Sequence, residues 1–144
     1  MINAQRILDE CRAMSSYQLV PYAKEHMQTV YNYLTVFKKI NRSQAIAAIL
    51  ECVCICVALD GYFNDGEWQF LKKVFDLSEY DYNTVRNQVS GATTIRIKRD
   101  ASEFCKSFPY LQRKALISLC MATMCADGRF TYEDLDFLED CLLG

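Results

Sequence analysis

The sequence predicts an all-α protein, a single-domain helical bundle of about seven helices. Over most of the chain, apolar residues recur at steps of three and four, the period of a helix with one buried face. The 144 residues contain only 2 Pro and 5 Gly, which is few for a fold with many strands and turns. Residues that cap helices precede most of the apolar runs.

The N-terminal part, residues 1–42, predicts two helices. Asn3 is a suitable N-cap for a short helix that ends near Met14. Pro21 suits the first turn of a longer helix that ends near Ile40, where Lys38 and Lys39 complement the negative helix end. The apolar face of the longer helix is expected to contain Ala23, Met27, Val30, Leu34 and Phe37, broadened by Tyr22, Tyr31, Tyr33 and Val36.

The middle of the chain alternates apolar runs with turn signals. A strongly apolar helix over residues 44–59 has Ser43 as its N-cap and ends at Asp60-Gly61. A second helix, Asp65–Phe75, has Asn64 as its N-cap. A third, over residues 78–89, begins with the capping-box pair Ser78 and Asp81.

The remainder predicts a connector and three helices. Residues 93–98 alternate in polarity, so we expect a short extended connector. Asp100 and Glu103 open a short helix, and Pro109 begins a long helix through Cys125. Thr131 caps the last helix, over residues 132–142.

The chain matches itself at an offset of 67 residues. Leu50–Gly61 aligns with Ile117–Gly128, and the match continues into the helix that follows each Asp-Gly turn. We therefore expect one domain over residues 1–144, with repeats at 43–90 and 109–144 around the connector at 91–108. The two units would pack about a pseudo-twofold axis and share one core.

These residues resemble the TerB-like family, known from tellurite resistance and from the N-terminal region of DjlA-type co-chaperones. Val57–Gly61 and Met124–Gly128 match the family's helix ends, and Glu133-Asp134 matches its acidic pair, whereas Gly66 departs from that pair in the first repeat. The resemblance covers residues 43–142. It implies a non-enzymatic helical domain that binds a divalent cation, engages a partner protein and acts in stress response.

The Asp-Gly turns are the candidate metal site. Asp60 and Asp127 end apolar helices, where a negative charge is unfavourable by roughly 0.3–1 kcal/mol, so a cation would offset it. Oxygen ligands favour Ca²⁺, Mg²⁺ or Mn²⁺. The alternative is that these side chains only cap the following helices, without an ion. The candidate ligands are Asp60, Asn64, Asp65, Glu67, Asp127, Thr131, Glu133 and Asp134.

Composition excludes several functions. A net charge of −2 and a pI near 5.4 argue against nucleic acid as a partner. The single histidine, His26, has no nucleophile motif beside it, so we expect no enzyme. The apolar stretch over residues 45–59 is shorter than the roughly 20 residues of a membrane span, and no signal peptide is evident, so we expect a cytoplasmic protein.

The 8 cysteines are expected to be core residues rather than disulfides or metal ligands. A thiol-based activity toward oxidants is a third, weaker interpretation. Trp68 is expected to pack rather than to form a partner hot spot.

Partner and oligomeric state are not predicted beyond a probable protein partner. The basic stretch Arg96–Arg99 could touch anionic lipid or phosphate, but its three charged residues make a weak lipid-binding cluster. A metal-free helical interaction module is the alternative to the cation-binding domain.

Overall fold

The computed structural model describes residues 2–57, 65–76, 95–126, 136 and 139. Throughout these residues the regular structure is helical and no strand occurs, which confirms the all-α prediction. The helices predicted over residues 78–89 and 132–142 lie outside the described residues, apart from the exposed Asp136 and Glu139. The elements are α1 (Ala4–Arg12), α2 (Ser16–Asn32), the π-helix η1 (Tyr33–Phe37), α3 (Arg42–Val57), α4 (Asp65–Phe75), α6 (Ile95–Lys106) and α7 (Tyr110–Cys125).

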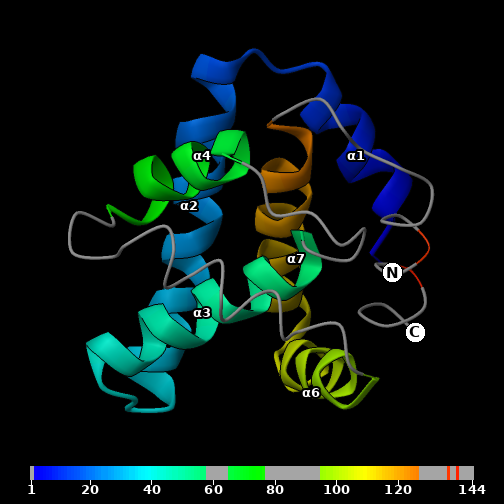
Figure 1. Ribbon diagram of the computed structural model, residues 1–144. Coiled ribbons are helices and arrows are strands. Elements are labelled where there is room, and N and C mark those ends of the chain that lie inside the picture. The colour runs from blue at the N-terminus through cyan, green and yellow to red at the C-terminus, as the bar shows by residue number, and fades with distance from the viewer. Residues whose placement is uncertain (1, 58–64, 77–94, 127–135, 137–138, 140–144) are drawn as a thin grey trace.

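Helix α7 is the central element of the bundle (Figure 1). It packs against α1, α2, α3, α4 and α6. Its residues from Ala115 to Met124 are all buried, so this helix has no solvent-facing side over that stretch, as expected for a helix that is apolar all round. The other described helices form a single hydrophobic core around it.

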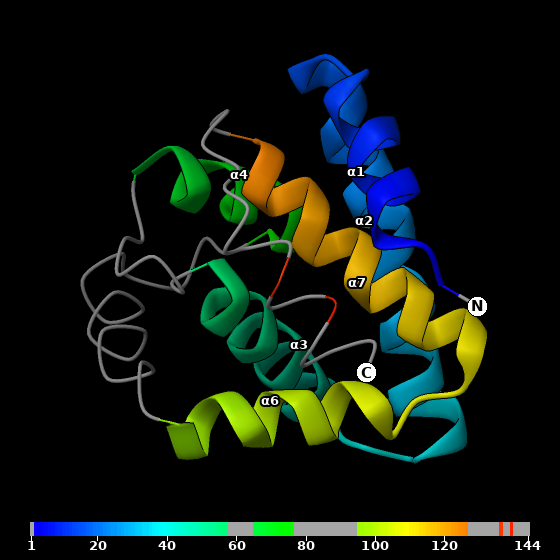
Figure 2. The same ribbon diagram turned by 90° about the vertical axis from the view of Figure 1, so that its right-hand side faces the viewer.

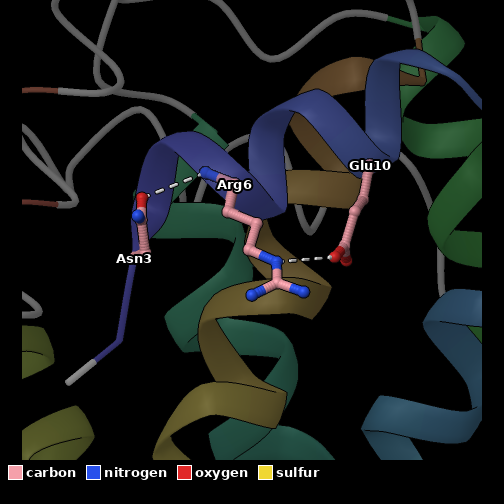
Figure 3. Close-up of polar contacts among 3 residues, drawn as sticks. All are labelled: Asn3, Arg6 and Glu10. Carbon is pink, nitrogen blue, oxygen red and sulfur yellow. Dashed lines mark hydrogen bonds and ion pairs between the residues drawn. The ribbon is translucent and has the colours of Figure 1, made fainter.

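Helix α1 begins as the sequence predicts. The Asn3 side chain accepts a hydrogen bond from the backbone N–H of Arg6 at 3.1 Å (Figure 3). The Arg6 guanidinium also lies 3.6 Å from the Glu10 carboxylate, one turn further on. Both side chains of this ion pair are largely exposed, so the pair adds little stability. Capping, together with the buried face around Ile7 and Leu8, is what holds α1 in place.

Helix α2 begins five residues earlier than the sequence predicts. Ser15 and Gln18 form a capping box, in which the Ser15 backbone N–H donates to the Gln18 side chain at 2.9 Å. This cap satisfies the free N–H groups of the first turn, and it places Pro21 inside the helix rather than in its first turn. The predicted start at Pro21 is therefore wrong.

The last turns of the predicted long helix are a π-helix. The Lys38 N–H bonds to the Tyr33 carbonyl, five residues back, at 3.2 Å. The wider turn changes the direction in which the following side chains point. Leu34 stays buried, but Val36 and Phe37 are exposed, so the prediction that these two residues complete the apolar face is wrong.

The structure tests the predicted cap of α3, whereas Asn64, the predicted cap of α4, lies outside the described residues. Asn41, not Ser43, caps α3, because the Asn41 side chain accepts a hydrogen bond from the Ser43 N–H at 2.8 Å. Helix α4 has the predicted bounds. Trp68, in the first turn of α4, is buried, as expected for a packing residue.

The predicted extended connector is wrong over residues 95–98, because α6 begins at Ile95. Ser102, Cys105 and Phe108 are buried at three-residue steps along α6 and the turn after it, and α6 packs against α3. This packing overrides the weak local preference for alternation. The short helix expected to open at Asp100 is thus the second half of a longer one.

Only part of the predicted internal repeat can be compared with the structure. Helix α3 shifted by the offset of 67 covers nearly the same residues as α7. Their surroundings differ in part, because Glu51 of α3 is exposed, whereas its counterpart in α7, Ser118, is buried. The counterpart of α4 lies outside the described residues, so the duplication stays a prediction.

Candidate functional site

Two of the eight predicted cation ligands are described. Asp65 and Glu67 both lie in the first turn of α4, but Asp65 is exposed and Glu67 is only 5% exposed. Residues two apart on a helix point in different directions, so the structure does not bring these two carboxylates together on one face. The other six lie outside the described residues: Asp60, Asn64, Asp127, Thr131, Glu133 and Asp134.

Glu67 contributes to the electrostatics of the core instead. Burial of Cys54 is the main reason that the pKa of its thiol is raised to about 12, and the negative charge of Glu67 raises it further. Cys54 is on α3, so this interaction joins the start of α4 to the neighbouring helix. Over the described ranges, no group of three or more His, Cys, Asp or Glu side chains is arranged to hold a metal ion.

The described cysteines behave as core residues. Cys11, Cys52, Cys54, Cys105 and Cys120 are buried, Cys125 is partly buried, and all six are free thiols. Burial raises the pKa of Cys105 to about 12. A thiol with so high a pKa carries almost no thiolate at neutral pH and is a poor nucleophile.

Side chains of α1, α2 and α7 influence one another's pKa values at one point of the core. The Tyr22 hydroxyl contacts both the Cys11 thiol and the Ser118 hydroxyl, and Cys11 also contacts Cys125. Burial raises the pKa of Tyr22 to about 12. The hydrogen bond to Cys125, followed by burial, holds the pKa of Cys11 well above its usual range. These groups are neutral at physiological pH and serve to fasten three helices together.

The single histidine, His26, belongs to the partly buried face of α2. It is half-buried on α2, and its ring meets the ring of Tyr22 edge-on at 4.5 Å between centroids. Burial lowers the pKa of His26 below its ordinary value of 6.5. The imidazole is therefore neutral at pH 7.

The feature that sequence reasoning missed is an exposed apolar surface. Val36 and Phe37 on η1 are 67% and 75% exposed, and Tyr110 and Leu111 at the start of α7 are 51% and 68% exposed. We call these four residues the aromatic end. Ring contacts link Phe37 through Tyr33 to Phe108, two residues before Tyr110. Exposed apolar side chains on one part of a protein mark an interaction site.

Contacts between aromatic rings connect the two halves of the aromatic end. The Tyr33 ring lies 5.8 Å from that of Phe37 and 5.4 Å from that of Phe108. Phe108 in turn meets Phe104 edge-on at 5.0 Å. These separations are those of favourable aromatic pairs. Figure 2 shows the turn between α6 and α7, the segment that contains Phe108.

One sequence signal could have identified this surface. Val36 and Phe37 directly precede Lys38 and Lys39 at the end of a helix, where a chain leaves the core. The apolar spacing alone assigned them to the buried face, because that spacing assumes an uninterrupted α-helix.

Comparisons of the chain with protein-family models, curated proteins and solved structures each found no match. The resemblance to the TerB-like family accordingly stays a prediction from its motifs. None of the helices that the structure describes has both the length and the apolar character needed to cross a membrane.

Proposed function

We propose that the protein is a non-enzymatic helical interaction module that docks through its aromatic end. The observation that carries this proposal is the exposure of Val36, Phe37, Tyr110 and Leu111 on segments linked by contacts between aromatic rings. Burying such side chains against a partner stabilises a complex by about 25 cal/mol for each Å² of apolar surface removed from water.

The rest of the described chain supports a structural role. The thiols of Cys54 and Cys105 are buried, and burial is the main reason that their pKa values and that of Tyr22 are raised. Such shifts arise in structural networks as well as in active sites. At the aromatic end, by contrast, large apolar side chains are exposed to solvent.

Gradient sedimentation of extracts from cells that make the protein tests this function. We expect the wild type to migrate in an assembly larger than the monomer, and a Val36→Ser/Phe37→Ser variant to migrate as the free chain. Tyr17→Ser is the matched control, because Tyr17 is a 92% exposed aromatic residue outside the aromatic end. Wild type that sediments as a free monomer, or a double variant that keeps the assembly, contradicts the proposal.

The divalent cation expected at the Asp-Gly turns is a separate proposal. Its support is the acidic sequence of both turns and the resemblance to the TerB-like family. Chelator-treated protein would be melted with Ca²⁺, Mg²⁺ or Mn²⁺, beside an Asp60→Asn/Asp127→Asn variant. At about 100 times the dissociation constant, binding adds roughly 2.7 kcal/mol. A melt that no metal shifts would show that the aspartates do not form this site.

A further inference from the structure

We propose that the aromatic end docks on an anionic membrane surface, with Val36, Phe37, Tyr110 and Leu111 entering the interfacial region. This inference rests on the proposed function and names its partner. Three observations support it: the degree to which the side chains protrude, the charges around them, and their place in the bundle.

The protrusion favours a soft, flat partner over a peptide. Val36, Phe37 and Leu111 are each exposed by two thirds or more, so they stand out from the surface instead of lining a groove. A helical peptide needs a groove to receive its apolar face. A bilayer interface instead accepts side chains that project from a protein surface, and aromatic residues are favoured at the level of the lipid headgroups.

The charges around these residues are basic. The segment over residues 33–50 contains Lys38, Lys39 and Arg42, and the segment over residues 104–126 contains Lys106, Arg113 and Lys114. Neither segment contains an Asp or a Glu. The nearest acid before the second segment is Glu103, one residue upstream of it. The chain as a whole has a net charge of −2, so this excess of positive charge is local.

The basic residues are also accessible. Lys38, Lys39 and Arg42 are exposed, as are Lys106 and Lys114. Lysine side chains beside an inserted apolar residue can extend to lipid headgroups while their methylene groups stay in the apolar region. Each basic residue near an anionic leaflet strengthens binding, and the attraction fades within a Debye length. The apolar tips and the lysines beside them are thus suited to the same layer of the membrane.

The position in the bundle allows the contact. In Figures 1 and 2 the end of η1 and the junction of α6 with α7 both lie in the lower half of the molecule. The start of α2, which carries Tyr17, and helix α4 lie in the upper half. A membrane that meets the lower part of the molecule leaves α4 clear, so the two regions supply matched sites for a test.

The test is flotation of the purified protein with vesicles of phosphatidylcholine alone or mixed with phosphatidylserine. We expect binding to the mixed vesicles only, and weaker binding at high salt. Val36→Ser/Phe37→Ser removes apolar contact, and Lys38→Glu/Lys39→Glu reverses two charges. Each should reduce the partition coefficient by about tenfold or more.

The controls match these variants in chemistry. Tyr17→Ser removes an aromatic residue that is even more exposed than Phe37, and Lys72→Glu/Lys73→Glu reverses two adjacent exposed lysines at the end of α4. Both should bind as the wild type does. All four variants change exposed side chains, so melting temperatures close to that of the wild type would confirm that they fold.

Three results would overturn the inference: no binding to the mixed vesicles, equal loss in the controls, or loss in the lysine variant while the Val36/Phe37 variant binds normally. The last would indicate a simple anion site without insertion. If the vesicles fail but the Val36/Phe37 variant still leaves its assembly in cell extracts, the interaction module stands and its partner is a protein. If the variant keeps its assembly, the proposed function itself is wrong.

Discussion

Two leucines on α7 provide a direct test of how this helix sits in the bundle. Leu116 is fully buried, whereas Leu111 is 68% exposed. The two are five residues apart, which turns the side chain by about 140° around the helix axis. Replacing each by alanine makes the same chemical change in two different environments.

The expected cost at Leu116 follows from its burial. Leu→Ala at a fully buried site removes apolar contacts and leaves a cavity, which costs about 3 kcal/mol. Unfolding entropy near 2.1 cal/mol/K for each residue amounts to roughly 0.3 kcal/mol/K for a chain of this length. Leu116→Ala should therefore lower the melting temperature by about 10 °C.

The expected cost at Leu111 is close to zero. Two thirds of this side chain already contacts water, and alanine is a slightly better helix former than leucine. Surface changes of this kind usually stay within about 0.5 kcal/mol, which corresponds to a shift of roughly 2 °C. Thermal unfolding followed by far-UV circular dichroism measures both variants. Equal losses, or a larger loss at Leu111, would show that α7 does not have the orientation described.

Three further predictions concern buried polar groups. Because burial lowers the pKa of His26 in the folded state, the unfolded chain takes up a proton first as the pH falls below 6.5. The free energy of unfolding should then decrease by at most about 1.4 kcal/mol for each pH unit, and denaturant titrations of His26→Asn should lack this component. Tyr22→Phe keeps the ring but loses the bonds to Cys11 and Ser118, so urea unfolding should show a loss of about 1 kcal/mol; an unchanged midpoint would refute those bonds. Native thiol labelling should modify Cys125 before Cys54, and the reverse order would contradict their burial.

The sequence predicts helices where a local signal and the buried face agree. Helix α4 has its predicted bounds, and α7 begins directly after Pro109, because an apolar run and a recognisable start coincide there. Helix α6 was missed in its first turn because Ile95 and Ile97 alternate with basic residues as in a strand. Contacts made by the far end of that helix outweigh this local pattern.

The aromatic end was beyond what sequence periodicity can show. Phe37 follows Leu34 by three residues, so an uninterrupted α-helix would bury both. The π-helix places Leu34 inside and Phe37 outside, and nothing in the spacing marks that extra width. The cation site stays a prediction, because only Asp65 and Glu67 of its eight expected ligands belong to the described residues.

The central position of α7 has a consequence for synthesis of the chain. Every described helix before it, except η1, packs against a segment that the ribosome makes after them. At about 5–20 residues per second, the stretch between Phe75 and Cys125 takes on the order of 3–10 s to appear. During that time the apolar faces of α3 and α4, including Ile49 and Leu71, lack α7, the helix against which α3 and α4 pack. The nascent protein thus spends seconds as a set of unfinished helices, a stage at which chaperone binding or aggregation competes with folding.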